Sequence, residues 1–217
     1  MTISMSHYPI TLVDLEEGAI VVGGGAVAAR KVRGLLDAGA RVTVIAPQLT
    51  RELEDLVRDT RIAVIRRAYQ NGDLRDARVV IAATDEPQVN QAVYDEARAR
   101  GILVNVVDDP AHCTFHVPAI VRRGNLAIAI STGGASPALA KHLRAEIEKT
   151  IGAEYERLAQ LLAELRPRVQ ARVPREHREA LWRELIDAAL PLLRAGREAD
   201  ARRAMETLIQ KAVDRRQ

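Results

Sequence analysis

Aromatic residues and cysteine are scarce in this chain of 217 residues. Aromatics make up 3% of the sequence, and Cys113 is its single cysteine. One cysteine excludes an internal disulfide and is typical of a reducing compartment. We assign Cys113 to packing rather than to nucleophilic catalysis, because no neighbouring pattern would activate a thiolate. Few aromatics and no dense basic tract argue against nucleic-acid binding.

Long hydrophobic runs and clustered metal ligands are also missing. No stretch approaches the ~20 apolar residues of a membrane span, and the first 18 residues lack the pattern of a signal peptide, so we expect a cytoplasmic protein without a membrane partner. His112, His116 and His142 share no metal-ligand spacing, which favours packing or surface roles and predicts no metal site. The net charge of +3 suits an anionic small molecule better than a polymer.

A glycine-rich loop lies near the start of the chain. Residues 21–31 read VVGGGAVAARK, in which a short apolar run is followed by three glycines and then by a helical pattern. Gly23, Gly25 and Ala28 have the spacing G-x-G-x-x-A: the first glycine permits a tight turn, the second lets pyrophosphate approach the backbone, and the alanine permits close packing of helix on strand. The free N–H groups of a helix beginning near Ala26 would hold the phosphates. A ligand-free turn is the alternative.

The acid that usually follows the second strand of such a fold is missing. The expected strand 41–45 ends in Ala46-Pro47 instead of the Asp or Glu that binds the adenosine ribose hydroxyls. The residues alone therefore leave NAD and NADP both open.

Strand and helix patterns alternate through the first half of the chain. Strands are expected at 19–22, 41–45, 62–66, 78–82 and 102–107, helices at 26–38, 49–58 and 87–100, a short edge strand at 10–13 and a loop at 69–76. Strands separated by helices in this way predict an α/β fold: a Rossmann-type, doubly wound parallel sheet with its ligand crevice at the carboxyl ends of the strands.

The pattern changes after Pro110. Apolar runs at 115–121 and 126–130 predict a hairpin, and Ser136 is placed to cap a helix that begins with Pro137 and continues to about Thr150. From Glu154 onward the pattern is helical, with breaks expected at Pro167, Pro174, Pro191 and Gly196 that give about three short helices. We therefore divide the chain into a Rossmann domain (1–112), a small α+β segment (113–150) and a C-terminal helical domain (151–217).

Two groups of polar residues follow the fourth and fifth strands. Thr84, Asp85 and Asn90 either contact the ribose of a cofactor or cap the following helix. Asp108 and Asp109 either supply a general base at the nicotinamide end of the crevice or only form the turn before Pro110. The spacing leaves both alternatives open.

An anionic substrate has candidate ligands beyond the hairpin. Gly133, Gly134 and Ser136 precede a helix and resemble a carboxylate cradle, although turn chemistry alone explains them. Arg122, Arg123, Lys141 and Arg144 surround the hairpin and the helix, either to receive an anion or as ordinary surface charge.

Several motifs in order carry a resemblance to a known family. VVGGGAVAARK, IAATDEPQVNQAV, NVVDDP and FHVPAIVRRGNLAIAISTGGASPALAKHLR are similar to the precorrin-2 dehydrogenase family, whose domain also forms the N-terminus of siroheme synthase. The resemblance covers about residues 8–149. It implies NAD-dependent oxidation of precorrin-2 to sirohydrochlorin in siroheme or cobalamin synthesis, with Asp108 handling a proton. It also implies a homodimer in which residues 115–149 form much of the interface and help to build the substrate cleft.

The resemblance and the residues together give a predicted site. Precorrin-2 carries eight carboxylates, which basic residues and a glycine-rich helix start would match. The predicted cofactor-binding residues are Gly23, Gly24, Gly25, Ala26, Val27, Ala28, Ala46, Pro47, Thr84, Asp85, Asn90 and Val107. The predicted substrate-binding residues are His116, Arg122, Gly133, Gly134, Ser136 and Lys141.

Two other functions remain as alternatives. Some family members also insert iron into sirohydrochlorin, which needs no preformed metal site, so a bifunctional dehydrogenase and ferrochelatase is the first. The second is a regulatory module that binds NAD without turnover and contacts a partner through its helical tail.

Overall fold

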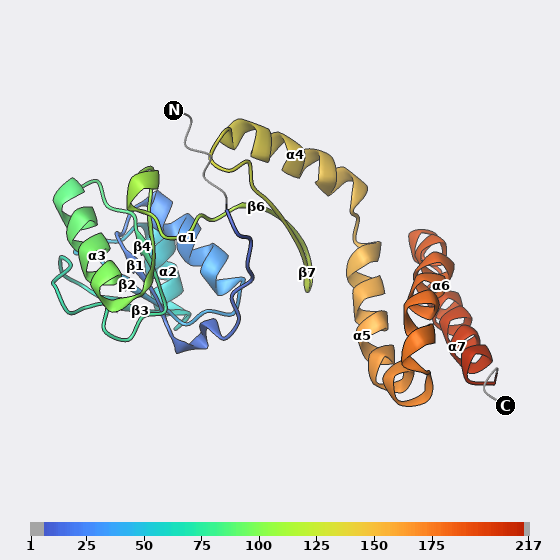
Figure 1. Cartoon of the computed structure of the whole chain (residues 1–217). Coiled ribbons are helices and arrows are strands. Elements are labelled where there is room, and N and C mark those ends of the chain that lie inside the picture. The colour runs from blue at the N-terminus through green and yellow to red at the C-terminus, as the bar shows by residue number, and fades with distance from the viewer. Residues whose placement is uncertain (1–6, 215–217) are drawn as a thin grey trace. The chain divides into compact units, whose positions relative to one another are not determined.

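The computed structural model describes residues 7–214, and the chain forms two compact units (Figure 1). The first comprises Tyr8–Val117, and the second comprises the chain from Pro118 onward together with His7. None of the helices within 7–214 has the length and apolar character needed to cross a membrane.

The first unit is built on a five-stranded parallel sheet. Its strands are β1 (Ala19–Val22), β2 (Val42–Ile45), β3 (Ile62–Ile65), β4 (Val79–Ala82) and β5 (Leu103–Val106). Their order is β3-β2-β1-β4-β5, which confirms the doubly wound arrangement and places the reversal of strand order between β1 and β4. Val22 pairs with both Ile45 and Ala82, so the strands end level and the loops that follow them share one edge of the sheet.

Helices cover both faces of this sheet. α1 (Ala26–Leu36) and α2 (Arg51–Arg58) contribute Ala28, Val32 and Leu53 to the core on one face. α3 (Pro87–Arg100) contributes Val93 and Ala97 to the core on the other. The small aliphatic side chains that the sequence supplies in place of aromatics let helices and sheet pack closely.

The segment before β1 is not the edge strand that we expected at 10–13. Ile10 and Val13 are each 65% exposed, and a short 3₁₀ helix, η1 (Leu15–Glu17), leads into β1. The guanidinium of Arg78 donates to the carbonyl oxygens of Val13 and Asp14 at 3.2 and 2.9 Å. These carbonyls therefore bind a side chain, and no sheet face buries the apolar side chains.

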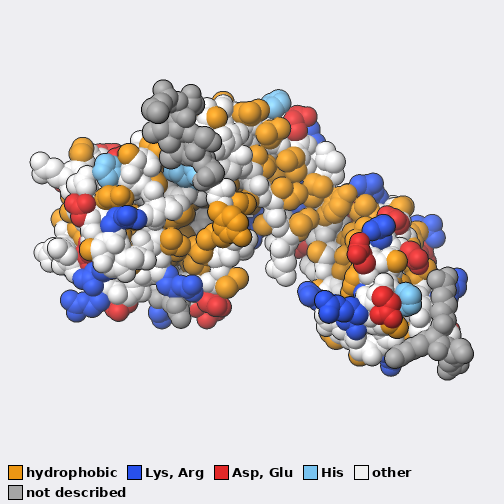
Figure 2. Space-filling model, in the orientation of Figure 1, with side chains coloured by type: hydrophobic (Ala, Val, Ile, Leu, Met, Phe, Trp, Pro, Cys, Tyr) orange, Lys and Arg blue, Asp and Glu red, His pale blue; other side chains and the backbone are white. Residues whose placement is uncertain are grey.

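The second unit begins with the predicted hairpin. β6 (Ala119–Arg123) pairs antiparallel with β7 (Leu126–Ile130), and α4 (Pro137–Thr150) packs on them through a core of Val121, Ile130 and Ala140. Ile120, Leu139 and Leu143 stay exposed, and Figure 2 shows hydrophobic side chains gathered over this part of the chain.

Three long helices complete the second unit: α5 (Glu154–Arg172), α6 (Arg175–Arg194) and α7 (Glu198–Asp214). The breaks predicted at Pro174 and Gly196 are confirmed, whereas those predicted at Pro167 and Pro191 are wrong, because both prolines lie inside helices. The apolar stripe of α5 continues past Pro167 to Val169, and both prolines face solvent. Burial of the stripe outweighs the backbone hydrogen bond that each proline removes, and water can solvate the carbonyl left without a donor.

Candidate active site

The three glycines after β1 have different surroundings. Gly23 has φ +128°, and a Cβ there would lie 2.2 Å from the carbonyl oxygen of Ala83. A Cβ at Gly24 would lie 1.8 Å from the carbonyl oxygen of Gln48. Gly25 has φ −81°, and a Cβ there would meet nothing within 4 Å. The first two glycines are therefore required by the fold, whereas the third leaves open space beside the loop.

The start of α1 is arranged to receive an anion. Gly25 is its N-cap and supplies no side-chain acceptor, so the N–H groups of the first turn are not capped by it. Ala28 is fully buried, as close contact between helix and strand requires. Open space above Gly25 and uncapped N–H groups fit the pyrophosphate of a dinucleotide, since nothing in the loop would obstruct its approach.

The loop after β2 is held against the glycine loop. The N–H of Thr50 donates to the carbonyl oxygen of Gly24 at 2.9 Å, and Ala46 is buried. No acid lies between Ala46 and Thr50. The carboxylates of Glu52 and Glu54, in the first turn of α2, are paired with arginines: Glu52 with Arg33 and Glu54 with Arg66. The geometry at this end therefore gives no ligand that selects between NAD and NADP.

Thr84 and Asn90 brace the start of α3. The side-chain amide of Asn90 donates to the carbonyl oxygen of Thr84 at 3.0 Å, and its oxygen lies 2.8 Å from the Thr84 hydroxyl. The N–H of Glu86 donates to the same hydroxyl at 3.2 Å. These bonds hold the turn before α3, but the N-cap of α3 is Glu86, whose side chain makes no capping hydrogen bond, so the predicted helix cap is not observed; contact with a ribose stays a prediction.

The two aspartates after β5 differ in conformation and contacts. Asp108 is exposed and has φ +60°, a left-handed conformation that Asp and Asn tolerate better than most residues. Asp109 accepts a hydrogen bond from Nδ1 of His112 at 2.7 Å and precedes the 3₁₀ helix η2 (Pro110–His112). The ring of His112 meets that of Tyr94 edge-on, with centroids 4.7 Å apart. These contacts fix the turn that presents Asp108.

Lys31 and Cys113 lie in the electrostatic environment of this turn. Burial, and then the neighbouring Arg30, lower the pKa of Lys31, although the charge of Asp108 opposes the shift. Burial raises the pKa of the Cys113 thiol. The thiol also donates to the carbonyl oxygen of Val106 at 3.3 Å, which supports the packing role that the sequence indicates.

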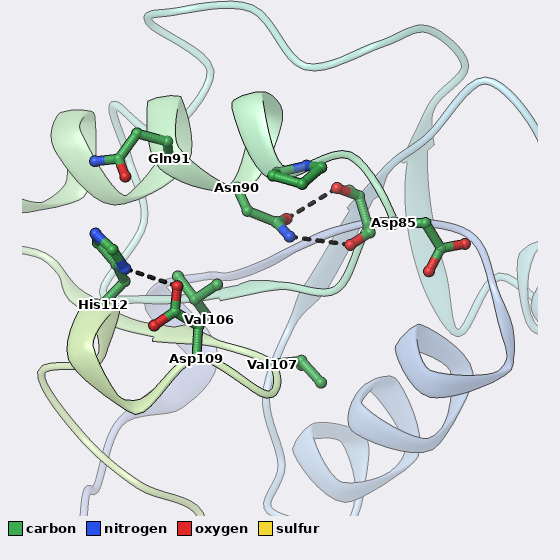
Figure 3. A pocket seen from close by; sticks show the side chains of 9 residues that line it. Asp85, Asn90, Gln91, Val106, Val107, Asp109 and His112 are labelled. Carbon is green, nitrogen blue, oxygen red and sulfur yellow. Dashed lines mark hydrogen bonds and ion pairs between the residues drawn. The ribbon is translucent and has the colours of Figure 1, made fainter.

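A cavity of about 290 Å³ opens at the ends of β4 and β5 (Figure 3). Val106 and Val107 give it apolar surface, and α3 and the turn after β5 contribute polar side chains to its wall. The residues that line it are Thr84, Asp85, Pro87, Asn90, Gln91, Val106, Val107, Asp109 and His112. It therefore brings together four of the predicted cofactor-binding residues, Thr84, Asp85, Asn90 and Val107, while Asp108 is not among its lining residues.

The predicted substrate-binding residues do not all belong to one unit. His116 lies in the first, whereas Arg122, Gly133, Gly134, Ser136 and Lys141 lie in the second. The Ser136 hydroxyl accepts from the N–H of Leu139 at 3.1 Å and so caps α4. Arg122 and Lys141 are exposed, and within 7–214 neither takes part in an ion pair.

Two of the other basic residues have structural partners. Arg123 donates to the carbonyl oxygens of Ile151 and Glu148 at 2.9 and 3.1 Å, near the end of α4. Arg144 pairs with the carboxylate of Glu148 at 2.6 Å. These contacts favour the structural alternative for Arg123 and Arg144, and leave Arg122 and Lys141 as the predicted ligands of an anion.

The sequence reasoning missed the pairing of His112 with Asp109 and the position of Lys31. The spacing D-P-A-H places a carboxylate and an imidazole three residues apart across a proline turn. That signal was present, but from the sequence we assigned His112 to packing or to the surface. Lys31 has no comparable signal, because its relation to Asp108 arises from the packing of α1 near the segment after β5.

Three family models match successive parts of the chain. "Putative NAD(P)-binding" matches residues 13–119, "Sirohaem biosynthesis protein central" matches 123–150, and "Sirohaem synthase dimerisation region" matches 154–209.

Curated relatives and a solved structure agree with these models. The siroheme synthase of Pseudomonas paraeruginosa (strain DSM 24068 / PA7) is 45% identical over 190 residues, which are 87% of this chain and 41% of that protein. The siroheme synthase of Thioalkalivibrio sulfidiphilus (strain HL-EbGR7) is 41% identical over 215 residues, 98% of this chain and 44% of that protein. The chain thus spans less than half the length of these relatives. The structure of "SirC, precorrin-2 dehydrogenase" matches with a TM-score of 0.74 and 29% identity, over 94% of this chain and 100% of that one.

The fold, the glycine loop and the cavity define a dinucleotide-binding protein of the Rossmann class. The matched segments follow one another over most of its length. The chain belongs to the family of precorrin-2 dehydrogenase and siroheme synthase.

Proposed function

We propose that this chain is an NAD-dependent precorrin-2 dehydrogenase that forms sirohydrochlorin in siroheme or cobalamin synthesis. One observation carries the proposal: a dinucleotide-binding loop with open space above Gly25 stands in a chain that matches a solved precorrin-2 dehydrogenase over that protein's whole length. Bound NAD would supply the hydride acceptor for the tetrapyrrole. The N–H groups at the start of α1 would hold its pyrophosphate.

Asp108 is the proposed proton-handling residue. Its carboxylate is exposed and lies on the turn directly after β5, at the sheet edge where the reacting end of a dinucleotide is expected. A carboxylate in this position can accept the proton that the macrocycle loses when the hydride leaves. The family resemblance of NVVDDP supports this assignment.

The substrate is proposed to bind as a polyanion. Arg122 and Lys141 offer charge without an ion pair in the described part of the chain, and Gly133 and Gly134, with φ +62° and +81°, form the turn before α4. His116 and Ser136 complete the proposed set. The eight carboxylates of the ring would accept hydrogen bonds from donors of this kind.

A homodimer is the proposed assembly. The region 154–209 matches a model described as a dimerisation region, and the exposed Ile120, Leu139 and Leu143 give the hairpin and α4 an apolar surface. The division into a Rossmann domain (1–112), a dimerisation and cleft segment (113–150) and a helical domain (151–217) stays part of the proposal, although the matched dimerisation region lies in the helical domain and outside the interface 115–149 that the resemblance implies. A single free cysteine fits action in the cytoplasm.

Turnover with Asp108→Asn tests the proposal. Asn keeps the left-handed backbone at φ +60° and removes only the charge, so the fold is preserved. Purified protein is incubated with precorrin-2 and NAD, and the absorbances of NADH and sirohydrochlorin are followed. Wild type should produce both, and D108N should lose at least about 100-fold in kcat while it still binds NAD.

The matched control is Asp59→Asn, at the exposed C-terminal end of α2, which should leave turnover unchanged. Wild-type protein that makes no NADH above a protein-free blank would refute the dehydrogenase. If wild type binds NAD without turnover and D108N binds NAD equally well, the result favours the regulatory module that only binds NAD. Ferrous iron added to accumulated sirohydrochlorin tests the bifunctional alternative, which fails if insertion is no faster than the spontaneous rate.

A further inference from the structure

Several polar side chains of the cavity beside β4 and β5 already have partners within the protein. Thr84 and Asn90 hydrogen-bond each other, and the amide nitrogen of Gln91 donates to Asp95 at 2.9 Å. The ionisable side chains that line the cavity are Asp85 and the pair formed by Asp109 and His112 (Figure 3).

The pair is oriented by its own contacts. Nδ1 of His112 lies 2.7 Å from a carboxylate oxygen of Asp109, and the Tyr94 ring packs edge-on against the imidazole. When Nδ1 carries the proton that Asp109 accepts, Nε2 of the neutral imidazole is a hydrogen-bond acceptor. The side chain of His112 is 33% exposed and lines the cavity, so a ligand there can reach the imidazole.

Shape and charge restrict what the cavity can hold. About 290 Å³ is at the lower end of the range for small-molecule sites, enough for part of a dinucleotide. Pro87, Val106 and Val107 offer apolar contact to a flat ring. Two carboxylates, Asp85 and Asp109, would repel the carboxylates of a tetrapyrrole and attract a cation.

We propose that Asp109 and His112 bind the nicotinamide riboside end of NAD, and that the cavity favours the oxidised, cationic ring over the reduced, neutral one. Nε2 of His112 accepts a hydrogen bond from the carboxamide or from a ribose hydroxyl. Asp109 holds the imidazole in place and adds negative charge beside the ring. This inference rests on the proposed NAD-binding function and assigns it two residues that the glycine motif does not reach.

Binding measurements with three ligands distinguish contacts to the nicotinamide riboside from contacts to the rest of the cofactor. Affinities for NAD⁺, NADH and ADP-ribose are measured by titration calorimetry on the full chain; ADP-ribose contains the pyrophosphate but no nicotinamide. The variant His112→Phe keeps a ring against Tyr94 and removes both nitrogens. It should bind NAD⁺ about tenfold more weakly, the effect of one hydrogen bond, with ADP-ribose affinity within about twofold of wild type.

A second variant tests the charge. Asp109→Asn should lower the preference for NAD⁺ over NADH by about five- to tenfold, again without an effect on ADP-ribose. The control His177→Phe, at an exposed position of α6 in the other unit, should change none of the three affinities.

The outcomes distinguish the inference from the function on which it rests. If the variants leave NAD⁺ affinity intact, or weaken ADP-ribose by the same factor, the inference is wrong while NAD binding stands. If wild-type protein binds neither NAD⁺ nor ADP-ribose, the proposed function fails and the inference with it. Thermal melting of each variant shows that the folded protein was titrated.

Discussion

Replacing Gly25 with alanine should separate the binding of NAD from the stability of the fold. A Cβ at Gly25 meets nothing within 4 Å, and its φ of −81° is ordinary for alanine. The variant should therefore fold, with a stability within about 1 kcal/mol of wild type, because the freedom that alanine removes from the unfolded chain is offset by the poorer fit of alanine at the N-cap of α1. The added methyl group occupies the space through which pyrophosphate approaches α1. Loss of one charge-assisted hydrogen bond, at about 2–3 kcal/mol, predicts NAD affinity lower by about 30- to 150-fold.

Two other glycines supply the controls. Gly34 lies inside α1 and is exposed, and a Cβ there also meets nothing, so Gly34→Ala should add roughly 0.5–1 kcal/mol and leave NAD affinity unchanged. Gly24→Ala places a Cβ 1.8 Å from the carbonyl oxygen of Gln48 and should cost at least about 1–3 kcal/mol. Calorimetric titration with NAD and urea unfolding give both quantities. A G25A protein that is stable and binds NAD within twofold of wild type would refute the assigned path of the pyrophosphate.

Two further predictions concern stability. Burial alone would raise the pKa of Glu96, but hydrogen bonds from the Tyr69 hydroxyl, the Gly72 N–H and Arg100 outweigh it and lower the pKa. Its carboxylate therefore stabilises the fold above its unfolded pKa, and this contribution is lost as the pH falls through the lowered folded pKa. Glu96→Gln should cost about 1–3 kcal/mol at pH 7 in urea unfolding, and an undiminished gap to wild type in strong acid would contradict this account. Pro167→Ala restores a backbone donor inside α5 and should raise the unfolding free energy by about 1–3 kcal/mol; an unchanged or lower value would show that the helix depends on the proline.

Much of the first unit could be predicted from sequence because glycine or proline marks the ends of several of its helices and strands. β1 and α3 have the predicted bounds, since the glycines end β1 while Pro87 and Gly101 delimit α3. The apolar pattern at 10–13 wrongly predicted a strand, because the carbonyl oxygens of Val13 and Asp14 accept hydrogen bonds from Arg78 and not from a neighbouring strand. The expectation that proline ends a helix was wrong in α5 and α6, because burial of a continuous apolar stripe outweighs the low helix propensity of proline.

The candidate site was predictable in part for the same reason. The glycine loop is one contiguous motif, so its turn and the helix start could be predicted from residues 23–28, whereas its contacts with Gln48, Thr50 and Ala83 could not. The hydrogen bond between His112 and Asp109 depends on the conformation of the turn after β5. The sequence also does not show whether the side chain of Asn90 binds a ribose or the carbonyl oxygen of Thr84, which it binds here. Such choices are made by packing and by competing hydrogen bonds, which a linear pattern does not record.

The hydrogen bond from Thr50 to Gly24 has a consequence for any attempt to redesign the coenzyme preference of this protein. A transplanted segment at 46–50 would have to keep a small residue at 46, where Ala46 lies against Gly24, and a backbone donor at 50. Proline at position 50 has no N–H and would remove the hydrogen bond between the two loops. Both the glycine loop that would bind pyrophosphate and the loop after β2 that would lie near the ribose would then be disturbed. Substitutions limited to positions 47–49 would change the coenzyme-facing loop and keep the hydrogen bond from Thr50 to Gly24.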